Sequence, residues 1–273
     1  MPDRTFPDYL RTLADFAAGA KLSDLSAAAR DHARWIIADC IPVVAAGMQQ
    51  PEMKTLVERH LARAGQGGCW VIGANRRAAP LDAALLNGTA GTWLEFDEGN
   101  LFAAGHPGIQ VVPAAVAVAQ DIGARGDDLL LAVALGYEIS SRINRASQVR
   151  FAVHPHGTFG TIGAAVAGAK LKRFDAAQMM DLINSSATMG MATSRNAIID
   201  GATVRNIYTG HSGYMGLMAV QLVECGFTGE SDGVYQIYGR VISDGFARAK
   251  VIEGLGSEWL IAKSYFKLHP VGR

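Results

Sequence analysis

Cysteine is scarce in this sequence. Its 273 residues include three cysteines, Cys40, Cys69 and Cys225, which lie far apart along the chain. No CxxC pair occurs, so the usual ligand spacing of zinc ribbons and iron–sulfur clusters is missing. An odd number of well-separated cysteines does not predict a disulfide framework. We therefore expect a protein of a reducing, cytoplasmic compartment.

Long apolar runs are missing as well. The first ten residues, MPDRTFPDYL, contain no apolar stretch of the kind that signal peptides carry. Nowhere does the chain reach the roughly eighteen uninterrupted apolar residues that indicate a spanning helix. The sequence predicts no membrane partner.

Neither sign of charge is in excess. The chain has 25 Lys and Arg against 25 Asp and Glu, and charged residues make up 18% of it. Nucleic acids and anionic membranes both favour proteins with a basic surplus, so we expect neither as a partner. The charged fraction is below the roughly 25% of average soluble domains. A large buried fraction, or a surface covered by another domain or subunit, would account for it.

Most of the chain has a helical pattern. Ser26 is expected to cap the first predicted helix, and the helix over 109–120 is apolar almost all round, which is typical of a central buried helix. A short strand at 69–72 is left open. The predicted helices cover 27–45, 51–64, 79–96, 109–120, 127–149, 158–171, 175–189, 211–225 and 244–249.

Small residues recur at helical spacing in the 158–171 segment, in the rows Gly160–Ala164–Gly168 and Gly163–Ala167. Such rows predict two helices in close contact. No internal repeat and no Pro- or Ser-rich linker interrupts the chain. We therefore expect one large all-α domain over residues 1–273.

Three segments carry groups that can do chemistry, and the first is acidic. Glu95, Asp97 and Glu98 crowd the end of a predicted helix, and His106 follows before a proline. Acids so close together raise at least one pKa if they are buried. Such a cluster suits general acid–base catalysis or a Mg²⁺ site, whereas ordinary surface charges would look the same in sequence.

The second segment places His154 and His156 in a Pro/Gly loop before Thr158 and a glycine-rich helix. A helix N-terminus offers free N–H groups to a carboxylate or phosphate, and a histidine there can move protons near neutral pH. The third segment is a polar loop in which Arg205 could hold a carboxylate with two hydrogen bonds. Capping and loop packing are the alternatives for both.

Several familiar signatures are missing. The chain contains no GxSxG elbow, no GxxxxGK[ST] loop and no GxGxxG after a predicted strand. Serine hydrolases, P-loop NTPases and Rossmann oxidoreductases therefore find no support.

Taken in order, several short motifs resemble the MmgE/PrpD family, which includes 2-methylcitrate dehydratase, cis-aconitate decarboxylase and iminodisuccinate epimerase. The resemblance covers nearly the whole chain. Its main motifs are Asp39-Cys40-Ile41, Asn87-Gly88-Thr89-Ala90, the acidic cluster, His106-Pro107-Gly108, Gly136-Tyr137-Glu138 with Arg142, His154 with Gly157-Thr158, Asp200-Gly201 with Arg205, and Tyr265-Phe266-Lys267 with Pro270, Gly272 and Arg273.

The resemblance implies an all-helical large domain, usually in a homodimer, that acts on a small di- or tricarboxylate without metal or organic cofactor. Residue by residue, it implies that the catalytic groups are Glu95, Asp97, His106, His154 and Lys267, and that Arg205, His156 and Thr158 bind the substrate. A histidine would move a proton next to a carboxylate, and the basic groups would stabilise the enediolate that forms. Which histidine is the base is left open.

Family members are longer and continue after the FK motif into a smaller α/β domain, which this chain lacks. The resemblance therefore implies a fragment, one half of a split enzyme with a separate α/β chain, or a reduced protein. Dehydratase, decarboxylase and epimerase chemistry all remain open. The competing hypothesis is a non-catalytic helical protein that dimerises or binds a carboxylate.

Overall fold

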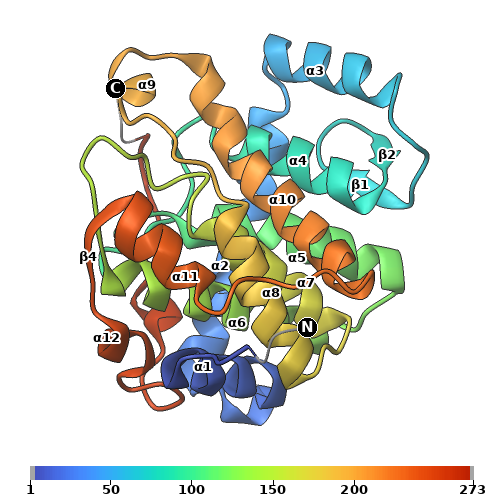
Figure 1. The fold of residues 1–273 in the computed structure, drawn as a ribbon. Coiled ribbons are helices and arrows are strands. Elements are labelled where there is room, and N and C mark those ends of the chain that lie inside the picture. The colour runs from blue at the N-terminus through green and yellow to red at the C-terminus, as the bar shows by residue number, and fades with distance from the viewer. Residues whose placement is uncertain (1–3, 271–273) are drawn as a thin grey trace.

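The structure is a computed structural model that describes residues 4–270, and helices dominate it (Figure 1). This confirms the all-α class. The helices are α1 (Asp8–Gly19), α2 (Ala27–Gly47), α3 (Pro51–Leu61), α4 (Pro80–Gly91), α5 (Pro107–Ile122), α6 (Gly126–Ala146), α7 (Gly160–Leu171), α8 (Ala176–Thr188), α9 (Asn196–Ile199), α10 (Ile207–Glu224), α11 (Gly233–Tyr235) and α12 (Arg248–Ile252). Helical turns occupy Leu22–Asp24, Thr203–Asn206 and Leu260–Lys263, and a π-helical turn occupies Gln236–Val241.

Two small antiparallel sheets complete the fold. In one, β1 (Cys69–Val71) pairs with β2 (Arg76–Ala78), which confirms a strand in the 69–72 stretch. In the other, β3 (Ser147–Val149) pairs with β4 (Ser243–Phe246). The buried apolar side chains form one continuous cluster that runs from Tyr9 to Ile261.

Helix α7 lies at the centre of the bundle. It contacts α5, α6, α8 and α10, and all of its residues except Lys170 are buried. The small residues allow this crowding: a Cβ added to Gly136 of α6 would lie 2.4 Å from the carbonyl oxygen of Gly163. The prediction of close helix packing from the small-residue rows is confirmed.

The predicted helix over 244–249 is wrong. Residues 243–246 form β4, and β3 takes the last residues of the helix predicted over 127–149. Asp244 and Gly245 are poor helix formers, and pairing between two distant segments decides the outcome. Helix α1 has no counterpart among the predicted helices.

The predicted helix over 79–96 is also too long, because α4 ends at Gly91. The chain then turns through Glu95, whose φ of 58° is left-handed. The acids therefore lie in a loop beyond a helix end rather than on it. Among residues 4–270, no helix combines the length and the apolar character that crossing a bilayer requires.

Candidate active site

The acidic loop after α4 is folded into the protein. Asp97 and Glu98 are 1% and 0% exposed, so two of the three clustered acids are buried. Burial raises the pKa of Glu98 to about 8, and the neighbouring charge of Asp97 adds to the rise. The expectation of at least one raised pKa in this cluster is confirmed, and burial raises the pKa of Glu95 as well.

A short loop brings His106 back beside these acids. Asn100 and Gly105 exchange two backbone hydrogen bonds of 2.9 and 3.3 Å, which closes the loop between them. His106 then forms the N-cap of α5. Its Nδ1 donates to the carbonyl oxygen of Glu98 at 2.6 Å, and the Glu98 side chain accepts from the N–H of Gly108 at 2.8 Å. One residue therefore fixes both the histidine and the start of α5.

The hydrogen bond to Glu98 fixes the tautomer of His106. Because Nδ1 donates its proton, Nε2 of the neutral ring carries the lone pair. No described residue hydrogen-bonds to that Nε2 atom. The His106 side chain is 22% exposed, whereas His154 and His156 are 4% and 0% exposed. His106 is therefore the histidine of this cluster best placed to accept a proton from a bound molecule.

The C-terminal segment places Lys267 opposite Asp97. Gly99 and Tyr265 form an antiparallel bridge with two backbone hydrogen bonds of 3.0 and 2.8 Å. Two residues before Gly99 and two residues after Tyr265, the antiparallel register sets Asp97 against Lys267. Their side chains meet with Nζ 3.1 Å from Oδ1, and Nζ also donates to the carbonyl oxygen of Glu95 at 3.1 Å. The Lys267 side chain is only 4% exposed, so its ammonium is held inside the protein.

The histidine loop is held by Gln110 and Thr193. The Oε1 atom of Gln110 accepts from the N–H of Gly157 at 3.1 Å and from the hydroxyl of Ser212 at 2.9 Å. Gly157 adopts a φ of 89°, which a residue with a side chain rarely takes. The Thr193 hydroxyl donates to the carbonyl oxygens of both His154 and His156. These contacts fix the backbone from which both imidazoles project.

His154 is a neutral hydrogen-bond donor. Its Nδ1 accepts from the backbone N–H of His156 at 3.0 Å, so the ring proton lies on Nε2. Burial lowers the pKa of His154 to about 3, and the positive charge of Arg205 contributes. His154 and His106 thus hold opposite tautomers: one offers a proton and the other a lone pair.

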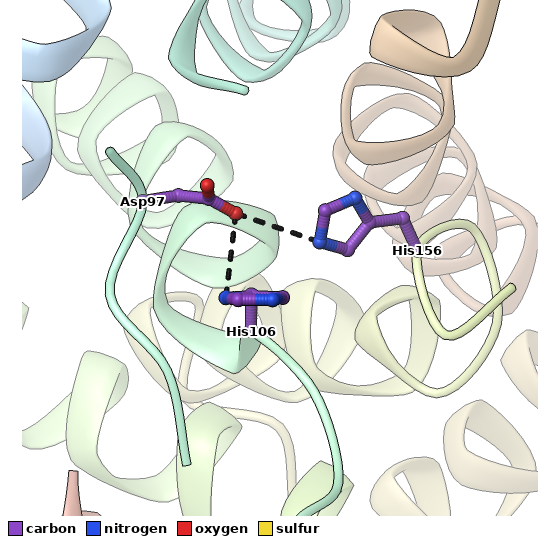
Figure 2. Close-up of side chains that lie close together, drawn as sticks. All are labelled: Asp97, His106 and His156. Atoms are coloured by element: carbon purple, nitrogen blue, oxygen red, sulfur yellow. Dashed lines mark ion pairs between the residues drawn. The ribbon is translucent and has the colours of Figure 1, made fainter. Parts of the chain in front are cut away.

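His156 lies between the other two histidines. Its ring centroid is 5.0 Å from that of His106 and 4.7 Å from that of His154. Burial drives its pKa well below the ordinary value, and neither ring nitrogen hydrogen-bonds to a described residue. Figure 2 shows His106 and His156 converging on one oxygen of Asp97, with nitrogen–oxygen distances of 3.5 Å each.

Arg205 is engaged by Glu95. The guanidinium forms a close ion pair with the Glu95 carboxylate and donates to the side-chain oxygen of Asn206 at 3.1 Å. Both side chains line a cavity of about 40 Å³, and Glu95 also borders a pocket of about 300 Å³ with Trp93 and Pro270. The structure thus pairs Glu95 with the arginine, and the acid beside the histidines is Asp97.

Thr158 offers no free N–H group. Its backbone N–H and its hydroxyl both point to the carbonyl oxygen of Pro155, at 3.4 and 2.6 Å. Helix α7 begins at Gly160 rather than at Thr158. The expectation of an open helix N-terminus at Thr158 is therefore wrong, because a tight turn uses these donors first.

Asp97, His106 and His156 could in principle hold a metal ion, since one ligand atom from each lies within 4.8 Å of the others. Two contacts disfavour this. The ammonium of Lys267 lies beside the Asp97 carboxylate, and Nδ1 of His106 already donates to Glu98. A nearby cation repels a metal ion, and a protonated nitrogen cannot ligate one. The donor set fits an acid–base cluster better.

The structure brings seven of the eight expected site residues into one cluster, and Thr158 lies in the turn that follows His156. The seven are Glu95, Asp97, His106, His154, His156, Arg205 and Lys267. Sequence reasoning missed Gln110, and it gave no role to Glu98 or Asp39 although both lie in motifs that it singled out. Burial raises the pKa of Asp39, and the charge of Asp97 contributes. The polar Gln110 inside an apolar helix was the available signal. Gly272 and Arg273 of the terminal motif lie outside the described residues.

Comparison with known proteins agrees with the sequence motifs. A family model described as the MmgE/PrpD N-terminal domain matches residues 11–244. The chain belongs to the MmgE/PrpD family. Cis-aconitate decarboxylase of Aspergillus terreus is 24% identical over 264 residues, covering 89% of this chain and 53% of the relative.

A second relative is the cis-aconitate decarboxylase-like protein oryM of Aspergillus oryzae. It is 25% identical over 277 residues, which cover 94% of this chain and 57% of that protein. The chain thus spans about half the length of the curated MmgE/PrpD relatives it matches. The acid and histidine positions described above lie within the matched residues 11–244, and Lys267 lies after them.

Proposed function

We propose that this chain carries the catalytic groups of a lyase or isomerase for a small di- or tricarboxylic acid. The observation that carries the proposal is the pair of opposite histidine tautomers beside Lys267 and Asp97. A proton leaving the carbon next to a carboxylate needs an accepting nitrogen, and the developing enediolate needs donors. The curated relatives are named for cis-aconitate decarboxylation, a reaction of this class.

In this proposal His106 is the base and His154 is a donor. Nε2 of His106 takes or returns the proton, since its Nδ1 is held by Glu98. Nε2–H of His154 and Nζ of Lys267 then stabilise the negative charge on the substrate carboxylate. Arg205 binds a second carboxylate when the substrate replaces Glu95, its partner in this structure. His156 lies between the two other histidines, and Thr158 holds the turn of the histidine loop.

We propose the reaction as one of those known in the family, without choosing among them. Dehydration of a 2-methylcitrate-like acid, decarboxylation and epimerisation each include a proton transfer at a carbon beside a carboxylate. Nε2 of His106 removes the proton in dehydration, delivers one after loss of CO2 when it starts protonated, and does both in epimerisation. Because the relatives are about twice as long as the matched region, we further propose that an α/β domain completes the site, either in the same polypeptide or as a separate chain. The helical domain over residues 1–273, a homodimer and a cytoplasmic setting remain predictions.

The test is turnover of a panel of acids by the native protein together with any such domain. Citrate, 2-methylcitrate, cis-aconitate and iminodisuccinate are followed by proton NMR. His106→Gln should slow the reaction by about 10²–10⁴-fold, the usual worth of a general base. His60→Gln is the matched control, since His60 of α3 also pairs with an aspartate, Asp82, but touches no site residue.

Lys267→Met should reduce both binding and turnover, because it removes a donor and leaves Asp97 buried without its partner. Unchanged turnover in both site variants would remove these residues from the mechanism. Tight binding of a polycarboxylate with no turnover of any panel member would favour the competing carboxylate-binding protein.

A further inference from the structure

A buried ion pair on α6 lies behind the segment that carries Lys267. Glu138 and Arg142 are both 0% exposed, and Nε of Arg142 donates to Oε1 of Glu138 at 2.6 Å. Nothing in the proposed chemistry uses them. A buried charge pair is stable only where further hydrogen bonds satisfy its remaining donor and acceptor atoms. The partners of Glu138 and Arg142 therefore show which part of the chain the pair holds.

The remaining four N–H groups of Arg142 all donate to one stretch of backbone. Nη1 donates to the carbonyl oxygens of Val251 and Glu253 at 3.3 and 2.7 Å. Nη2 donates to those of Gly254 and Glu258 at 3.2 and 2.7 Å. All five donors of the guanidinium are therefore in use.

Glu138 holds the continuation of the same stretch. Its Oε2 accepts from the backbone N–H groups of Leu260 and Ile261 at 2.6 and 3.3 Å. The carbonyl oxygen of Leu260 then accepts from the side chain of Asn100 at 2.8 Å, which ties the segment to the acidic loop. Four residues after Ile261, the bridge between Tyr265 and Gly99 begins.

We propose that the Glu138–Arg142 pair is a positioning device that sets Lys267 opposite Asp97. The pair fixes residues 251–261 as a unit, and the chain runs from there directly into the bridge that sets the register of Lys267. The segment contains Gly254 and Gly256, both at positive φ. Its only regular structure is the last two residues of α12 and the start of the helical turn at Leu260–Lys263. Local secondary structure alone would not hold it, so the charged pair supplies the anchor.

The inference rests on the proposed function only for the role of Lys267 in the reaction. The test of the inference needs no substrate. The amine of Lys267 is labelled with acetic anhydride in the full chain, and labelling is quantified by mass spectrometry. In Arg142→Lys, which has three donors in place of five, Lys267 should label roughly tenfold faster or more, as its segment opens locally. Arg142→Met should label faster still. Hydrogen exchange over 251–267 should rise in the same order.

Lys170 provides both an internal reference and a matched control. Its ammonium also donates to three backbone carbonyls, those of Ala17, Ala18 and Ala20, in a segment that carries no site residue. In the Arg142 variants, labelling of Lys170 should stay at the wild-type rate. Lys170→Met should leave labelling of Lys267 unchanged.

Two results would overturn the proposal. One is wild-type labelling of Lys267 in the Arg142 variants. The other is a parallel rise at Lys267 and Lys170, which would mean that the pair stabilises the whole fold and not this segment. If Arg142→Met does not fold, Arg142→Lys decides on the same two readouts. Loss of turnover in His106→Gln with no change in Lys267 labelling would separate the two proposals.

Discussion

At the scale of single residues, the site is defined by which atoms already have partners. His106 and His154 have the same side chain, yet a backbone carbonyl holds Nδ1 of the first as a donor and a backbone N–H holds Nδ1 of the second as an acceptor. Sequence shows two histidines and cannot show this difference. It depends on the turn geometry around Glu98 and His156, which only the folded chain fixes.

His154 should remain neutral across the physiological range. Burial and the charge of Arg205 lower its pKa to about 3, so its imidazole carries one proton, on Nε2, at every pH well above that value. Nitrogen-15 NMR of the ring should show a constant Nε2–H tautomer between about pH 5 and pH 8. A titration midpoint inside that interval would contradict the assignment, with free imidazole in the same buffer as the reference.

Glu98 should make the fold less stable as pH rises. Burial raises its pKa from an ordinary 4.5 to about 8. Between these values the unfolded chain has released the proton while the folded chain still holds it. The free energy of unfolding therefore falls as pH rises from about 4.5 to 8 and levels off above.

Glu98→Gln removes this titration and keeps an oxygen for the N–H of Gly108. Over the same pH interval, the Tm of Glu98→Gln should fall less than that of wild type. Each kcal/mol of pH-dependent stability that the substitution removes corresponds to roughly 2–4 °C in Tm. Glu52→Gln, at an exposed position of α3, is the control and should follow wild type. Parallel curves for wild type and Glu98→Gln would show that Glu98 is not protonated in the fold.

At the scale of elements, two short backbone bridges assemble the site. One closes the loop from Asn100 to Gly105, and the other joins Gly99 to Tyr265. A Cβ on Gly99 would lie 2.3 Å from the ring of Tyr265, so this position tolerates only glycine without a shift of the aromatic ring.

Gly99→Ala should therefore loosen the second bridge. We expect a loss of about 1–3 kcal/mol in the free energy of unfolding, typical of overpacking, and faster hydrogen exchange at the amide of Tyr265. Gly65→Ala is the control, because a Cβ there meets nothing within 4 Å. It should change stability by less than about 1 kcal/mol. Equal effects of the two substitutions would mean that the bridge does not depend on Gly99.

Helices with strong local signals could be predicted from sequence. Ser26 caps α2 with a 3.1 Å bond from Ala29, and the apolar pattern of α5 gives a helix that is buried from Pro107 to Ala119. The strand β4 could not be predicted, since its partner β3 is almost a hundred residues away in sequence. The same holds for the contact between Lys267 and Asp97, whose side chains a distant bridge brings together. Local patterns find the residues of the site but not their pairing.

At the scale of the whole molecule, exposed apolar side chains occur in the loops that carry the site. Leu101, Phe151 and Leu268 are 80%, 78% and 85% exposed, and each lies within five residues of Asp97, His154 or Lys267 in sequence. Solvent-exposed apolar groups of this size favour contact with another surface.

We therefore predict that the protein self-associates or binds a partner chain at micromolar concentration. Light scattering should show a mass above that of one chain, 28.9 kDa. Replacing Phe151 and Leu268 by serine should lower the associated fraction, whereas Phe227→Ser, an exposed residue beyond α10, should not. A monodisperse wild-type monomer would contradict the prediction.

The central claim is that Nε2 of His106 moves a proton at the carbon beside a substrate carboxylate. Its most direct test is turnover, in D₂O, of the acid from the panel that the native protein converts, with deuterium at that carbon followed by NMR. Wild type should place or exchange solvent deuterium there, and His106→Gln should slow that transfer by about 10²–10⁴-fold, while His60→Gln matches wild type. Deuterium transfer at the wild-type rate in His106→Gln would contradict the account.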